Sequence, residues 1–194
     1  MGMDSLDGLK VVFFADEQQL TAWLDEHHGD SPGIWVRLAK KNSGVASVTA
    51  VEVNDVALCY GWITGHRKSY DDVHYLQKIT RRRPRSLWSK VNIDRVAELT
   101  AEGRMREPGL AEVAAAQADG RWDAAYESQR NATVPDDLEA ALAASPAARR
   151  TFDGLARSQR YTVLHRLMTA RKAATRAARL ERMITALESG DKVS

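Results

Sequence analysis

The hydrophobic pattern of this chain changes once along its 194 residues. Up to about residue 130, short β-forming runs such as Ile34–Ala39 alternate with segments of helical periodicity such as Thr49–Tyr60. Beyond residue 133 every ordered segment has the helical period, with apolar residues three or four positions apart. The pattern predicts an α+β fold: a small mixed body over residues 1–130, followed by an all-helical C-terminal module over residues 133–194.

Local turn and capping signals mark individual elements of the mixed body. Thr49 precedes Glu52 by three residues, the spacing of a capping box, and predicts the start of a helix. The β-forming runs 63–68 and 74–80 flank a polar turn, so they predict a hairpin. Gly103 follows the last apolar residue of a later helical segment and predicts the end of that helix.

Composition places the chain among soluble proteins. Apolar residues make up 44% and charged residues 28%, and no window holds the roughly 18 uncharged apolar residues that a membrane span needs. The segment 1–10 has no basic stretch followed by an apolar core, so no signal peptide is predicted. Cys59 is the single cysteine, which excludes an internal disulfide. We therefore expect a cytoplasmic protein with no transmembrane segment.

Charge is distributed unevenly although the net charge is only +2. Residues 145–194 hold 11 Lys or Arg side chains against 4 Asp or Glu side chains, which leaves the rest of the chain acidic. A basic group lies on the last predicted helices: Arg171, Lys172, Arg176, Arg179 and Arg182. It is either the solvated face of an amphipathic helix or a surface for an acidic partner, a nucleic acid or an anionic surface.

A second basic cluster follows the predicted hairpin and consists of Arg81, Arg82, Arg83 and Arg85. Four guanidinium groups within five residues repel one another unless they are solvated or paired with anions. Trp88 comes three residues after the last of them, and arginine forks beside an aromatic ring suit contact with phosphate or nucleic acid. The alternative is a solvated loop that pairs with the acidic body.

The segment Ala57–Gly65 joins an apolar helix end to a glycine, a tryptophan and a second glycine. Gly61 has no Cβ, so the backbone there can turn and approach another segment closely. Tyr60 and Trp62 flank this turn and could form a ligand cleft together with Trp88. The alternative is that these large rings fill the core.

No constellation of residues predicts catalysis. The chain contains neither the G-x-S-x-G turn of hydrolases nor a G-x-G-x-x-G or P-loop sequence. Cys59 lies among apolar neighbours, as expected for a buried, inert thiol. His66 and His74 could face each other across the hairpin, but a metal would still need a third ligand from its turn. We predict no catalytic residue, no metal site and no cofactor.

Short motifs that match a known family occur in order over almost the whole chain. They are Trp23-Leu24, His27-His28, Ile34-Trp35-Val36, Lys40-Lys41, Ser43-Gly44, Ala57-Leu58-Cys59-Tyr60-Gly61-Trp62-Ile63, Pro84-Arg85-Ser86-Leu87-Trp88-Ser89-Lys90-Val91-Asn92, Gly103-Arg104-Met105, Gly109-Leu110, Gly120-Arg121-Trp122-Asp123-Ala124-Ala125-Tyr126, Ser158-Gln159-Arg160-Tyr161, Ala170-Arg171-Lys172 and Thr175-Arg176. Together they resemble the YdeI/OmpD-associated family, also described as bacteriocin-protection proteins. Thr64 departs from that family's usual aspartate, and Arg166-Leu167 stands where the family has Trp-Ile.

The resemblance implies tolerance of bacteriocins or cationic antimicrobial peptides and association with an outer-membrane porin, and it implies no reaction. We therefore predict a soluble bacterial protein that acts by binding an acidic partner in a stress or tolerance role. The expected contact surfaces are the Gly61–Trp62 turn, the 81–88 segment and the basic helix 171–182. Two alternatives stay open: nucleic-acid binding through the same arginines, and small-molecule binding or catalysis in a pocket lined by Tyr60, Trp62 and Trp88.

Overall fold

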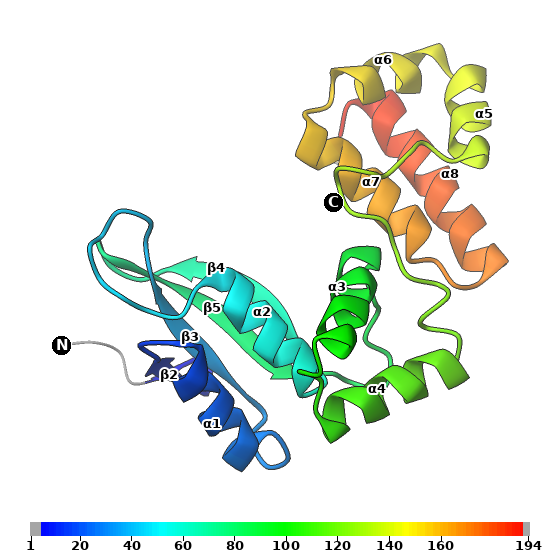
Figure 1. Cartoon of the computed structure of the whole chain (residues 1–194). Helices are drawn as coiled ribbons and strands as arrows, with labels where there is room; N and C mark the ends of the chain where they lie inside the picture. The colour runs from blue at the N-terminus through cyan, green and yellow to red at the C-terminus, as the bar shows by residue number, and fades with distance from the viewer. Residues whose placement is uncertain (1–4, 192–194) are drawn as a thin grey trace. The chain divides into compact units, whose positions relative to one another are not determined.

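The computed structural model describes residues 5–191 and has the predicted α+β class (Figure 1). Residues 1–4, which begin the segment examined for a signal peptide, and residues 192–194 lie outside the described residues. The elements in chain order are β1 (Ser5–Leu6), β2 (Leu9–Phe13), α1 (Glu17–His27), β3 (Gly33–Ala39), α2 (Ala50–Cys59), β4 (Trp62–Ser69), β5 (His74–Arg81), α3 (Lys90–Ala101), α4 (Glu107–Ala118), α5 (Asp136–Ala144), α6 (Pro146–Gly154), α7 (Arg157–Met168) and α8 (Ala173–Ser189).

The chain forms two compact units. The first contains the residues up to Ser86 together with Asp94–Arg121, and the second contains Leu87–Ile93 together with the residues from Trp122 onward. The boundary therefore falls twice near α3, once before it and once within it. The predicted division into a body over 1–130 and a module over 133–194 stays a prediction.

A five-stranded sheet in the order β1-β2-β3-β5-β4 organises the first unit. β2 and β3 are parallel and are joined through α1, whereas β3 and β5 are antiparallel. The predicted hairpin is confirmed, since β4 and β5 pair antiparallel with a register shift between Thr64 and Arg67. This register places Trp62 opposite Arg81, which brings the α2–β4 turn and the end of β5 to the same end of the sheet.

Alternation along β3 explains how the sheet is covered on its two faces. Ile34, Val36 and Leu38 are fully buried in the core of this unit. Trp35 points to the other face and is also buried, because the side chains of Lys68 and Lys78 extend over its ring at 5.2 and 5.6 Å. Long cationic side chains therefore cover Trp35 on this face of the sheet.

The helices α1 and α2 lie side by side against the sheet (Figure 1). Asp16 caps α1 by accepting from the amide of Gln19 at 2.9 Å. The predicted capping box of α2 is confirmed: Thr49 accepts from the amide of Glu52, whose carboxylate accepts from the amide of Thr49 at 2.7 Å. Both helices therefore begin where their side chains satisfy backbone donors.

The four last helices form the core of the second unit. Their buried residues are Leu138, Leu142, Ala148, Phe152, Val163, Leu164, Leu167, Met183 and Leu187. Ser145 caps α6 by accepting from the amide of Ala148, and Gly190 ends α8 with a φ of 72°. Within residues 5–191, no helix is both long and apolar enough to cross a membrane.

Candidate ligand-binding pocket

A pocket of about 420 Å³ opens in the first unit where α2 turns into β4. Five residues predicted to bind a ligand or partner lie together on its wall: Tyr60, Gly61, Trp62, Arg81 and Arg82. The β4–β5 register explains their convergence, because the first residue of β4 lies opposite the last residue of β5. The remaining lining comes from the end of α1 and the first half of α4, namely His28, Gly29, Pro108, Ala111 and Glu112.

Gly61 gives the pocket its tight base. Its φ of 70° lies in the left-handed region, and its carbonyl accepts from the amide of Arg82 at 3.4 Å. A Cβ at this position would lie 2.9 Å from the carbonyl oxygen of Pro108. The predicted close approach of backbone at this glycine is therefore confirmed, and the neighbouring segment is α4.

Trp62 forms the closed back of the pocket. Its side chain is only 1% exposed, and its indole Nε1 donates to the carbonyl of His28 at 3.2 Å. The ring of Trp23 packs edge-on against it at a centroid distance of 6.0 Å. Trp62 therefore shapes the wall and fixes the end of α1, and it offers a ligand an edge at most.

Tyr60 is held from two sides. Its hydroxyl donates to the carboxylate of Asp25 on α1, and the imidazole of His28 packs over its ring at a centroid distance of 5.7 Å. Burial and the bond to Asp25 raise the pKa of Tyr60 to about 12, so the phenol stays protonated at neutral pH. Tyr60 is thus a rigid neutral wall, and this geometry does not prepare it as a base.

The pocket carries a positive electrostatic bias. Arg81 is exposed at the rim and its Nη1 donates to the carbonyl of Gly29 at 2.8 Å, while Arg82 is 9% exposed. Glu112 is the carboxylate among the described lining residues, and Arg121 binds it at 2.7 Å from outside the lining. Arg121 also binds Asp119 at 2.6 Å, so it neutralises Glu112 only in part, and the two lining guanidinium groups outnumber this one carboxylate.

Sequence reasoning missed His28, Pro108 and Glu112 as lining residues. Nothing in the sequence indicates that α4 approaches the α2–β4 turn. A Cβ on Gly109 would clash with the backbone of Cys59, so this glycine marks the approach of α4 to α2. The contact is visible only in the structure.

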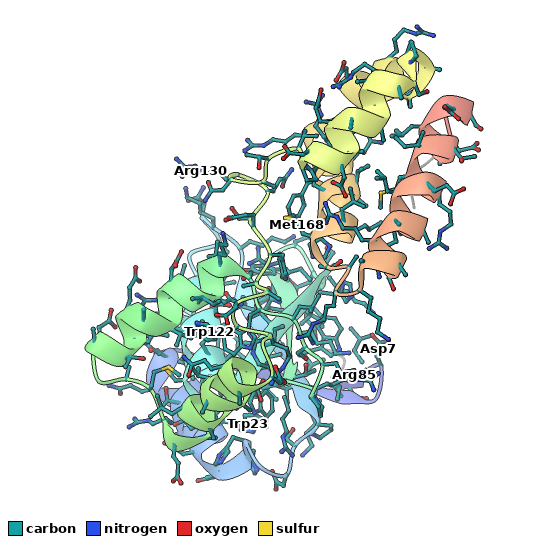
Figure 2. All side chains as sticks on the ribbon, turned by 90° about the vertical axis from the view of Figure 1, so that its right-hand side faces the viewer. Asp7, Trp23, Arg85, Trp122, Arg130 and Met168 are labelled. Carbon is teal, nitrogen blue, oxygen red and sulfur yellow. The ribbon has the colours of Figure 1, made fainter. Side chains whose placement is uncertain are left out.

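The other predicted residues of the 81–88 segment lie elsewhere. Arg83 and Arg85 are exposed in the loop after β5, where Arg85 projects from the ribbon (Figure 2). Trp88 belongs to the second unit, where it is buried against Trp122 at a ring-centroid distance of 5.0 Å. The pocket therefore forms without Trp88, and the interpretation of this tryptophan as a core residue fits its burial.

Two arginines of the predicted basic helix are engaged within the second unit. Arg176 binds Asp137 through Nε and Nη2, at 2.7 and 2.8 Å, and its Nη1 donates to the carbonyl of Leu167 at 2.8 Å. Arg179 donates to the carbonyl of Arg166 at 2.6 Å. Both carbonyls lie in the last turn of α7, so both arginines help to cap that helix. Arg171 and Lys172 are exposed, and a binding role for the group stays a prediction.

The Arg176–Asp137 pair predicts a pH dependence of the second unit. Hydrogen bonds from Arg176 lower the pKa of Asp137 from its ordinary value of 3.8. The pair therefore stabilises the folded unit above that pH, and the contribution is lost as the pH falls through the lower folded pKa. In hydrogen exchange of α5 and α8 amides from about pH 6 to pH 3, Asp137→Asn should remove an acid-dependent loss of about 1 kcal/mol or less. Glu181→Gln, an exposed carboxylate on α8, should leave that dependence intact.

Cys59 and His74 of the first unit, whose side chains could in principle react or bind a metal, are held in structural contacts. Cys59 is buried, and burial raises the pKa of its thiol to about 11, which keeps the thiol protonated. His74 pairs with Asp71 at 3.1 Å, and its own turn thus satisfies it. Across residues 5–191, no three His, Cys, Asp or Glu side chains gather closely enough to hold a metal ion.

Comparison with known families divides the chain in two. A family model described as a domain of unknown function (DUF8412) matches residues 12–112, and this match includes every residue that lines the pocket. A model described as bacteriocin-protection, YdeI or OmpD-associated matches residues 131–190, so the predicted resemblance is confirmed for the C-terminal part. Searches of curated proteins and of solved structures found no match.

Proposed function

We propose that this chain, which belongs to the family of the DUF8412 domain, is a binding protein in tolerance of bacteriocins or antimicrobial peptides. The DUF8412 model covers more than half of the chain, and the last helices match the bacteriocin-protection, YdeI or OmpD-associated family. In this proposal the first unit holds a ligand in the pocket beside Gly61. No reaction is assigned to it.

One observation carries the binding role. Five residues that the sequence singled out for binding line a single pocket, although they come from two segments about twenty positions apart. The pocket combines a rigid aromatic wall with two guanidinium groups, and concave sites with a few convergent polar groups are typical of ligand binding. The nucleic-acid alternative has less support, because Arg176 and Arg179 are engaged by groups of their own unit.

Survival of a bacteriocin-sensitive strain tests the proposal. Cells that produce the full chain should survive a higher concentration of a pore-forming bacteriocin or a cationic antimicrobial peptide than cells with an empty vector. Arg81→Glu reverses a charge at the pocket rim and should remove the advantage. Arg150→Glu makes the same change at an exposed site on α6 and should retain it.

Equal amounts of each variant, measured by immunoblot, make the comparison valid. A wild-type chain that gives no advantage would overturn the tolerance role. An Arg81→Glu variant as protective as the wild-type chain would instead show that the pocket is not the site that matters.

A further inference from the structure

We infer that the pocket binds a small phosphate monoester, with its phosphoryl group between Arg81, Arg82 and His28 and its organic group against Pro108 and Ala111. The inference rests on the proposed function in one respect, namely that this pocket is a ligand site. It adds the chemical class of the ligand, which follows from charge, donor geometry, rigidity and size.

Charge selects an anion. Arg81 and Arg82 bring two permanent positive charges to the wall, because guanidinium groups stay protonated in proteins. The single charge of Arg121 is shared by Glu112, at 2.7 Å, and Asp119, at 2.6 Å, so this group retains one negative charge, and the two lining guanidinium groups exceed it by one. The net positive charge of the lining attracts an anionic ligand more strongly than a neutral or cationic one.

Donor geometry distinguishes phosphate from carboxylate. The bond from Arg81 to Gly29 uses one of the five N–H groups of the guanidinium, which leaves the fork able to bind two anion oxygens. Arg82 brings a second guanidinium to the same pocket, and His28 brings one ring nitrogen. Two guanidinium groups and one imidazole can contact the three terminal oxygens of a phosphoryl group, whereas a carboxylate has only two oxygens.

His28 is oriented for this role. A carbonyl oxygen only accepts, so the 2.9 Å contact between Nδ1 and the carbonyl of Leu24 requires a proton on Nδ1. Nε2 is therefore the ring nitrogen that can meet a ligand. It accepts from a protonated phosphate when the imidazole is neutral and donates to a dianion when the imidazole is charged.

The donors are fixed before a ligand arrives. The backbone carbonyl of His28 accepts from Trp62, and the imidazole of His28 packs on the ring of Tyr60. The backbone carbonyl of the next residue, Gly29, accepts from Arg81. The two-residue segment after α1 thus ties the histidine and the rim arginine to the rigid wall. Such preorganisation lowers the entropy cost of binding. The volume of about 420 Å³ lies within the range of small-molecule sites and exceeds what a bare phosphate would fill.

Isothermal titration of the full chain tests the ligand class. The probes are phenyl phosphate, phosphoserine and glycerol phosphate, with benzoate, phenol, inorganic phosphate and a short oligothymidylate as comparisons. At least one monoester should bind, and benzoate and inorganic phosphate should bind about tenfold more weakly or worse.

Variants locate the bound molecule. Arg81→Gln should weaken monoester binding about tenfold or more. Arg81→Lys keeps the charge and loses the fork, so its affinity should lie between those of the wild-type chain and Arg81→Gln. Arg150→Gln should bind as the wild-type chain does, and matching thermal melts should show that each variant folds. A loss for Arg81→Gln that Arg150→Gln shares would place the ligand outside the pocket.

The outcomes separate this inference from the proposed function. No monoester binding at millimolar concentration, equal binding of benzoate, or tighter binding of the oligothymidylate would each overturn the monoester class. If a monoester binds in the pocket while cells gain no protection, the tolerance role fails and the ligand class stands. If cells are protected through Arg81 and another class of ligand binds, the reverse holds.

Discussion

Replacing Gly109 by alanine should destabilise the first unit by about 3 kcal/mol or more. Gly109 lies in the first turn of α4 and is buried, and an added Cβ would lie 2.2 Å from the carbonyl oxygen of Cys59 and 2.7 Å from its carbon. Both are backbone atoms at the end of α2, so they cannot rotate away as a flexible side chain would. The same oxygen accepts from the amide of Arg106 at 3.1 Å. Relief therefore requires α4 to move away from α2.

Urea unfolding monitored by tryptophan fluorescence measures this loss. Gly29→Ala is the matched control in the same unit, because no described atom lies within 4 Å of its added Cβ, and its stability should change by about 0.5 kcal/mol or less. The displacement of α4 should also disturb the pocket, since Pro108 approaches the base formed by Gly61. A Gly109→Ala variant as stable as Gly29→Ala would contradict the close packing of α2 against α4.

The local parts of this fold could be predicted because their signals are local. The box of Thr49 and Glu52 lies within one helical turn, and the runs 63–68 and 74–80 are joined by a short turn. The sheet order could not be predicted in this way, because β3 pairs with β5 across the intervening α2 and β4. Such long-range pairing depends on which faces are buried together, and a single sequence does not contain that information directly.

Only half of the candidate site could be predicted from the sequence, because local signals are readable there and long-range contacts are not. The predicted hairpin places the glycine turn and the arginine cluster at the same end of two paired strands, and the observed register sets Trp62 opposite Arg81. Its other wall comes from α1 and α4, whose approach no local pattern records. The basic helix shows the opposite limit: Arg176 reads as a solvated cation, yet its partner Asp137 lies 39 positions earlier in the chain.

Replacing Arg95 by methionine should cost the first unit about 3 kcal/mol, because it leaves a buried carboxylate with its main partner removed. Asp55 on α2 has a side chain only 6% exposed, and Arg95 binds it with both ends of its fork, at 2.9 and 2.7 Å. Arg104, at 3.9 Å, is too far away to replace these hydrogen bonds.

A second substitution separates the lost ion pair from the lost packing of the arginine. Adding Asp55→Leu to Arg95→Met removes both charges, and apolar replacement of a buried pair is often close to neutral, so the double variant should recover most of the lost stability. The exposed pair of Lys68 and Asp7, at 2.7 Å, is the control: Asp7→Asn keeps a side chain that tolerates the positive φ there and should change the stability far less than Arg95→Met does. Urea unfolding of the four chains measures all of these differences. If Arg95→Met loses no more than Asp7→Asn, Asp55 is hydrated despite its burial, and the contact between α2 and the first unit's part of α3 does not depend on this pair.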